Sequence, residues 1–169
     1  MRLSNSPPNA TGSTTVSRLA AMLDAPVLGS IAHISLGLSR GPKRVGLAIV
    51  AHHGKAGGKL AGTTINQVAD LRTVFTDADI YMMGHDHQRG AWPQSILHVS
   101  PTGHGEPRLH ARRQWLCRTG SYLRAYAPGM ASYAASRLLR PADLGGIELE
   151  IGLDTHDGSS VSAEVRAIV

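Results

Sequence analysis

Two short histidine motifs contain the residues of this chain best suited to chemistry. One is His-His-Gly at residues 52–54, and the other is Gly-His-Asp-His at residues 84–87. Neutral imidazole is the commonest side-chain ligand for metal ions. We expect His85 and His87, two residues apart on an extended loop, to point the same way and to reach the same ion or adjacent ions. The types and spacing of these residues therefore predict a metal site with histidine ligands.

Each motif follows a short apolar run that has the composition of a buried strand. The runs occupy residues 45–51 and 79–83. A glycine-rich stretch lies between them, followed by a helical pattern that begins at Thr63 or Thr64 and ends near Phe75. This succession of strand, loop, helix, strand and loop predicts a layered α/β sheet with functional groups at the carboxyl ends of its strands.

The rest of the chain alternates between helical and strand patterns. Residues 16–23 have the apolar spacing of one helix face, and Pro26 follows them. Residues 31–38 alternate as a strand, which we expect to pair with residues 45–51 as a hairpin. Further predicted elements are strands at residues 95–99, 108–116 and 117–123, a short helix at 130–139, and a final hairpin of 146–153 with 160–169.

Length and composition predict one domain with a hydrophobic core. We expect residues 1–14 to form an irregular lead-in and residues 15–169 of the 169-residue chain to form the domain. The single cysteine, Cys117, excludes an intrachain disulfide and is expected to be buried in a strand. No apolar run has the roughly 18 residues of a membrane span, and no signal segment is evident, so we expect a cytoplasmic protein with no membrane partner.

Several segments together resemble the calcineurin-like metallophosphoesterases, and most closely their phage and prophage branch. Residues 51–54 (Ala-His-His-Gly), the glycines and Asn66 of residues 57–66, and residues 78–88 (Ala-Asp-Ile-Tyr-Met-Met-Gly-His-Asp-His-Gln) resemble the last two metal-binding motifs of that family. The C-terminal region of the branch is similar to residues 118–123 (Arg-Thr-Gly-Ser-Tyr-Leu), 132–134 and 137–145. The resemblance extends from about residue 9 to residue 153.

The resemblance implies a fold, an activity and a set of ligands. The fold would be α/β, a partial layered α-β-β-α sandwich without the N-terminal half of its sheet. The activity would be hydrolysis of a phosphoester substrate by two divalent ions (Mn, Fe, Zn or Ni) that activate a bridging water. By resemblance His53 and His85 bind one ion and His87 the other. The neighbouring or pocket residues would be His52, Gly54, Gly84 and Asp86.

The earlier motifs of the family do not occur in this chain. They are D-x-H, G-D-x-x-D and G-N-H, and the sequence contains no Gly-Asp and no Asn-His dipeptide. Its one D-x-H, residues 154–156, reads as a hairpin turn, which argues against a circularly permuted first motif. The chain therefore resembles the C-terminal portion of such an enzyme. We expect little or no phosphatase activity from it alone, unless a separate N-terminal half or self-association completes the site.

Two other functions stay open at this point. The fold could have lost catalysis and kept binding, with nucleic acid as a partner of its basic residues; the net charge is +5. Alternatively, His53, His85 and His87 could form a single zinc site with three ligands. The basic residues that would serve nucleic acid are Arg108, Arg112, Arg113 and Arg118.

Overall fold

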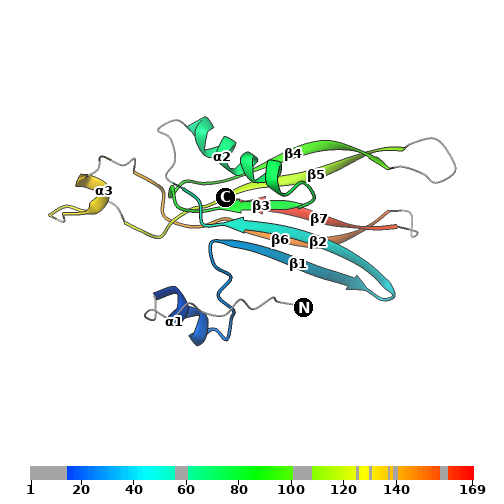
Figure 1. Cartoon of the computed structure of the whole chain (residues 1–169), viewed down its shortest axis with the longest axis horizontal. Coiled ribbons are helices and arrows are strands. Elements are labelled where there is room, and N and C mark those ends of the chain that lie inside the picture. Colours follow the sequence, from blue (N-terminus) through cyan, green and yellow to red (C-terminus); the bar gives the residue numbers. More distant parts are fainter. Residues whose placement is uncertain are drawn as a thin grey trace.

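The protein is a mixed α/β structure with a five-stranded mixed sheet and few helices (Figure 1). This computed structural model describes residues 15–55, 61–100, 108–124, 126–129, 131–136, 138, 141–156 and 160–169. Its helices are α1 (Thr15–Met22), α2 (Ala61–Val74) and α3 (Tyr133–Ser136). Its strands are β1 (Ile31–Arg40), β2 (Lys43–His52), β3 (Ile80–Met83), β4 (Arg89–Ser100), β5 (Arg108–Thr119), β6 (Glu148–His156) and β7 (Ser160–Ile168).

The three central strands of the large sheet are parallel, and each of its two outer strands is antiparallel to its neighbour. The strand order is β1-β2-β3-β5-β4, with β3 parallel to both β2 and β5. The edge strands β1 and β4 pair antiparallel with β2 and β5. Because His52 pairs with Met83 and Met83 pairs with Arg118, the ends of β2, β3 and β5 meet at one edge of the sheet. Both histidine motifs begin at this edge.

One face of the sheet is covered by α2. Alternate strand residues point to opposite faces, and the set that contains Val50, Tyr81 and Leu116 packs against Val68 and Leu71 of α2. All five side chains are buried. The helix forms where the sequence predicts it, and its apolar stripe is the surface that it buries.

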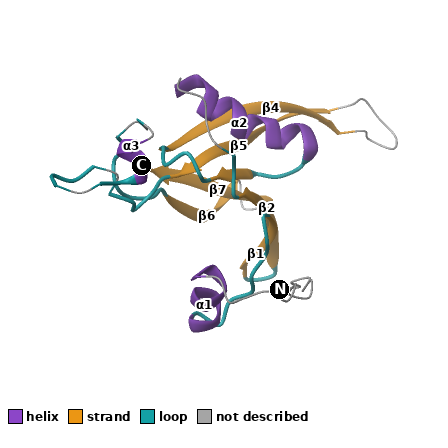
Figure 2. Ribbon diagram, turned by 60° about the vertical axis from the view of Figure 1, so that its left-hand side comes forward, coloured by secondary structure: helices purple, strands orange, loops and turns teal. Residues whose placement is uncertain are grey.

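The other face of the sheet is covered by the hairpin of β6 and β7. Leu47, Ile49, Ile80 and Cys117 form a second buried cluster, and apolar residues of the hairpin such as Val165 pack against it. The helix, the sheet and the hairpin thus form three layers in the order α-β-β (Figure 2).

The two remaining helices lie at the margins of the molecule (Figure 2). The predicted apolar stripe of α1 and the residue after it is exposed. Val16 and Leu19 in the helix and Leu23 just beyond it keep 64%, 55% and 67% of their surface accessible. No described helix is both long and apolar enough to cross a membrane.

Most of the predicted elements are confirmed, and one prediction is wrong. Residues 108–116 and 117–123 were expected to be two strands, but residues 108–119 form the single strand β5. It stays continuous because β4 pairs with it along its whole length, while β3 pairs with residues 115–118 on its other side. The predicted lead-in, residues 1–14, and parts of the predicted helix 130–139 lie outside the described residues.

Cys117 is buried in β5, as predicted. Burial in an apolar environment raises the pKa of its thiol to about 12, because the thiolate would lose its hydration. The thiol is therefore neutral and unreactive at ordinary pH.

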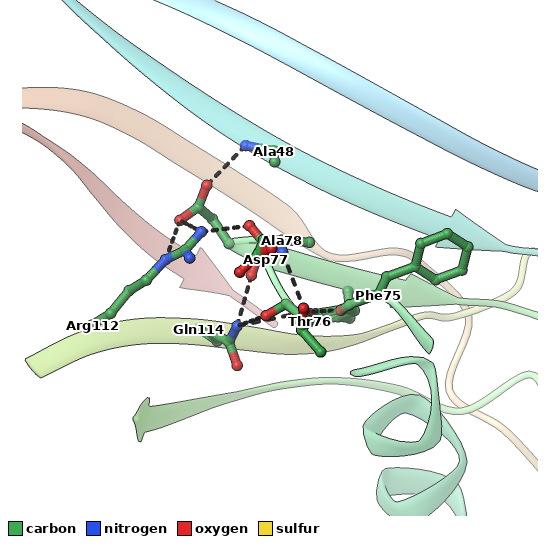
Figure 3. A network of polar contacts seen from close by, with 9 residues as sticks. Ala48, Phe75, Thr76, Asp77, Ala78, Arg112 and Gln114 are labelled. Carbon is green, nitrogen blue, oxygen red and sulfur yellow. Dashed lines mark hydrogen bonds and ion pairs between the residues drawn. The ribbon is translucent and has the colours of Figure 1, made fainter. Parts of the chain in front are cut away.

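A polar network holds the amino end of β3, opposite the histidines (Figure 3). Asp79 accepts a hydrogen bond from the backbone N–H of Ala48 at 2.8 Å and two from Arg112, from Nε at 3.0 Å and Nη2 at 2.7 Å. Arg112 Nη2 also donates to the carbonyl of Asp77 at 2.7 Å. Both carboxylate oxygens of Asp79 are thus paired, and the network ties β2, β3 and β5 together.

The same network continues under α2. Gln114 Nε2 donates to the carbonyl of Ala78 at 2.8 Å, and the Tyr81 hydroxyl donates to the carbonyl of Phe75. Burial raises the pKa of the Tyr81 hydroxyl above its ordinary value. These bonds satisfy the carbonyls between α2 and β3, where the chain enters the sheet.

Candidate metal centre

The loops that follow β2 and β3 bring His53 and His85 into contact. His53 Nε2 lies 3.1 Å from His85 Nδ1, and the two ring centroids are 5.0 Å apart with the ring planes at 71°. Both residues are exposed, so an ion or a substrate can reach the facing nitrogens from solvent. The structure therefore places together the two histidines that the resemblance assigned to one ion.

Two glycines allow the loops to approach this closely. Gly54 has φ +97°, and a Cβ on it would lie 2.6 Å from the carbonyl oxygen of Gly84. A Cβ on Gly84 would lie 3.3 Å from the carbonyl oxygen of His53. Beside them, His52 Nδ1 accepts a hydrogen bond from the N–H of Gly54 at 2.8 Å. His52 therefore contributes to the shape of the loop.

The second loop has an unusual backbone. The sequence led us to expect an extended segment with His85 and His87 on the same side, but both have positive φ, +76° and +61°. Left-handed backbone is uncommon for residues other than glycine and is concentrated at functional sites. The carbonyl of Gly84 accepts the N–H of Asp86 at 3.1 Å, and Asp86 Oδ1 accepts the N–H of Gln88 at 3.2 Å. These local hydrogen bonds turn the loop at Asp86.

Arg118, at the end of β5, lies directly behind this loop. Its side chain is fully buried, and its Nη1 donates to the carbonyl of Gly84 at 2.9 Å. On the other side, Nε and Nη2 donate to the carbonyl of Thr64 in α2 at 3.0 and 2.9 Å. Burial lowers the pKa of the guanidinium below its ordinary value, and the nearby Asp86 carboxylate opposes that shift.

The alternative of a basic surface for nucleic acid included Arg118, and its burial contradicts that part of the alternative. A strand exposes alternate residues on alternate faces, so Gln114, Leu116 and Arg118 share the face covered by α2. The signal was available in the sequence, because Arg118 follows Leu116 and Cys117 in an apolar run. The sequence did not indicate that α2 would provide hydrogen-bond acceptors for Arg118.

The three predicted ligands do not form one cluster. The described residues include no group of three or more histidine, cysteine, aspartate and glutamate side chains arranged to hold a metal ion. His87 is partly buried on the same loop as His85. A mononuclear zinc site made from His53, His85 and His87 is thus not assembled in this part of the chain.

The pair formed by His53 and His85 has the spacing of two ligands on one ion. Nitrogen ligands lie about 2.0–2.1 Å from zinc, so two of them in tetrahedral geometry are roughly 3.3 Å apart. The observed separation of 3.1 Å is close to this value. The two side chains therefore fit a transition metal that accepts imidazole.

A cavity of about 690 Å³ lies at the opposite edge of the sheet, between β5 and the hairpin, with Asp79, Arg112 and Asp154 in its lining. Asp154 lines the same cavity as Asp79, which immediately precedes β3, whereas the histidines follow β3. Asp154 therefore lies at the opposite edge from the histidines. The D-x-H match at residues 154–156 therefore does not join the metal centre.

The predicted nucleic-acid surface loses two of its four arginines. Arg118 is buried, and Arg112 forms an ion pair with Asp79 at 2.7 Å. Arg113 is exposed, and the side chain of Arg108 lies outside the described residues. Among the described side chains of this group, only Arg113 is exposed.

Comparison with family models, curated proteins and solved structures finds no match to this chain. Its function is therefore inferred from the chemistry of the site together with the resemblance of its motifs.

Proposed function

We propose that this chain carries part of the metal centre of a calcineurin-like metallophosphoesterase, a metal-dependent phosphoric-ester hydrolase. In this proposal the three layers seen here, α-β-β, belong to the α-β-β-α sandwich of that family. His53 and His85 hold one divalent ion, and His87 contributes to a second.

The contact between His53 and His85 is the observation that carries the proposal. The two residues are 32 positions apart, and parallel pairing of β2 with β3 brings their loops side by side. Their nitrogens are spaced as ligands of one ion, and the glycines that allow this approach belong to the same two motifs. The left-handed backbone at His85 and His87 gives independent support, because such strain is typical of functional loops.

A bound pair of ions would polarise a phosphoryl oxygen and lower the pKa of a bridging water. The residues of this chain would supply imidazole ligands on an exposed edge. Asp86 is the carboxylate nearest in sequence, but it already accepts the N–H of Gln88 and faces Arg118. We therefore propose that the carboxylate ligands of a complete centre come from a separate polypeptide half or a second copy of the chain.

The test is to measure binding of Zn²⁺, Mn²⁺ and Ni²⁺ to the full chain by calorimetry. We expect weak binding near one equivalent that is lost in His53→Ala and in His85→Ala. His33→Ala is the matched control, because His33 is exposed on the edge strand β1 and pairs with Val50 rather than with a histidine loop. Equal binding by the wild type and both loop variants would refute the assignment.

Activity gives a second test. We expect the isolated chain to hydrolyse a generic aryl phosphodiester little or not at all, even with added Mn²⁺, because two imidazoles without a carboxylate hold ions weakly. Manganese-dependent turnover that disappears in His87→Ala would show instead that the chain is sufficient for catalysis.

A further inference from the structure

Arg118 connects three segments that are distant in sequence. Its guanidinium donates to the carbonyl of Thr64 and, at 2.7 Å, to Oε1 of Gln67, both in α2. It also donates to the carbonyl of Gly84 at the start of the histidine loop. One side chain with no exposed surface therefore joins β5, α2 and the loop that carries His85.

Asp86 gives this arrangement an electrostatic component. Its side chain is 7% exposed, and Oδ2 lies 3.4 Å from Arg118 Nη2. That oxygen is buried and has no hydrogen bond within the described structure, so the guanidinium is the cation beside it. Burial makes an unpaired carboxylate costly, and this cost is reduced only while Arg118 stays in place.

The position of Asp86 in the loop makes this contact consequential for the histidines. The residues on either side of it, His85 and His87, both have left-handed backbone. A side chain drawn inward at Asp86 fixes the turn, and the turn directs His85 to His53. If Asp86 lost its contact with Arg118, we expect the strained backbone of His85 and His87 to relax.

We propose that Arg118 is a positioning residue for the metal centre. Through Gly84 and Asp86 it holds the second histidine loop against α2 in the conformation that pairs His85 with His53. Its relevance to metal binding rests on the proposed function, whereas its effect on the loop does not. Outer residues that orient metal ligands typically contribute 10–100-fold to metal affinity.

Asp86→Asn and Arg118→Lys are the test variants. The first keeps the shape of the side chain and the acceptor for Gln88 but removes the charge. The second keeps a cation but removes the planar fork that reaches several acceptors at once. Arg112→Lys is the matched control, because Arg112 also lies on β5 and pairs with an aspartate, at the other end of β3.

Two measurements are made on each full-length protein. Amide hydrogen exchange at Asp86 and Gln88 is recorded without metal, because the N–H groups of both residues make the hydrogen bonds that define the loop. Zinc affinity is then measured by calorimetry. We expect both test variants to exchange at least about tenfold faster at these two amides and to bind zinc about 10–100-fold more weakly. We expect Arg112→Lys to match the wild type in both measurements.

Unchanged exchange at Asp86 and Gln88 in both test variants would overturn the proposal. So would equally faster exchange in Arg112→Lys, because that would indicate general loosening of the protein. If Arg118→Lys does not fold, Asp86→Asn decides alone, since it leaves every hydrogen bond of Arg118 to α2 in place. If the wild type binds no zinc, the proposed metal centre fails, while the exchange rates still decide the role of Arg118.

Discussion

Each end of β3 is held by a pair of an aspartate and an arginine, and the two pairs differ in their surroundings. At the amino end Asp79 pairs with Arg112, and at the carboxyl end Asp86 lies beside Arg118. Both arginines belong to β5, and both connect the central strands to neighbouring segments. The chemical parts are the same, so any difference comes from the surrounding structure.

At the amino end the aspartate is fully paired and partly open to water. Both oxygens of Asp79 accept hydrogen bonds, and the side chains of Arg112 and Asp79 are 34% and 22% exposed. At the carboxyl end the arginine is completely buried, and Asp86 Oδ2 has no hydrogen bond among the described residues. The backbone beside Asp86 is left-handed on both sides, whereas Asp79 leads directly into a regular strand.

This difference indicates that the amino end of β3 is organised for stability alone. Gln114 Oε1, in the amino-end network, is also buried without a hydrogen bond among the described residues. An aspartate with both oxygens hydrogen-bonded and with ordinary backbone still needs no explanation beyond packing. Strained backbone, an incompletely paired buried oxygen and two exposed histidines occur together only at the other end. Natural proteins depart from local rules mainly at functional sites, so this end is the candidate centre.

The largest expected effect is a difference in the free energy of unfolding between substitutions of the two arginines. Arg118→Met leaves the buried Asp86 carboxylate without its cation and removes the hydrogen bonds to Thr64, Gly84 and Gln67. We expect it to lower the free energy of unfolding by about 3–5 kcal/mol. Arg112→Met exposes its partners to water, and we expect a loss of about 1–2 kcal/mol. Urea denaturation measures both. Equal losses would mean that the two ends are energetically alike.

A smaller effect is expected from adding one methyl group at the close approach of the loops. In Gly54→Ala the new Cβ would meet the Gly84 carbonyl at a residue with φ +97°, and we expect a loss of about 1–3 kcal/mol together with weaker zinc binding. Gly46→Ala is the control on β2, because a Cβ there has open space around it. We expect that variant to be unchanged or about 0.5 kcal/mol more stable. Thermal denaturation of the two variants side by side gives the answer, and a Gly54→Ala variant as stable as Gly46→Ala would contradict the described geometry.

The smallest effect tests the backbone strain directly. His87→Gly removes a side chain from a left-handed position, and we expect the free energy of unfolding to rise by about 0.5–1 kcal/mol while metal binding weakens. His98→Gly, in the exposed part of β4, should instead lose about 0.5–1 kcal/mol. A stabilised loop would show that the left-handed backbone at His87 is strained, and the weaker metal binding would follow from the loss of its imidazole. If His87→Gly is destabilised to the same extent as His98→Gly, the loop is not strained.

The sequence was sufficient for the local elements and for the position of both histidine motifs at strand ends. The alternation at residues 31–38 predicted the hairpin of β1 and β2, and the helical stripe after Thr64 predicted α2. Each depends on contacts within a short stretch of chain. The expectation that both histidine motifs end adjacent strands is confirmed by the pairing of His52 with Met83.

Contacts between distant segments could not be predicted in the same way. The insertion of β5 between β3 and β4 depends on which strands pair, and nothing in residues 108–119 states their partners. The burial of Arg118 follows from that insertion and from the position of α2. The turn at Asp86 was missed because two histidines one residue apart suggest an extended loop, while the contact with Arg118 favours a bent one.

The parallel centre of the sheet also sets the order in which this protein can fold. The hairpin of β1 and β2 closes over a two-residue turn, whereas His53 and His85 are separated by 32 residues and Arg118 and Thr64 by 54. Hairpins form in about 1–10 μs, but pairing across long loops pays its entropy first and is slow. The histidine edge should therefore assemble late, and no short fragment of the chain should reproduce it. An ion that binds there would then favour the finished fold over every earlier species on the pathway.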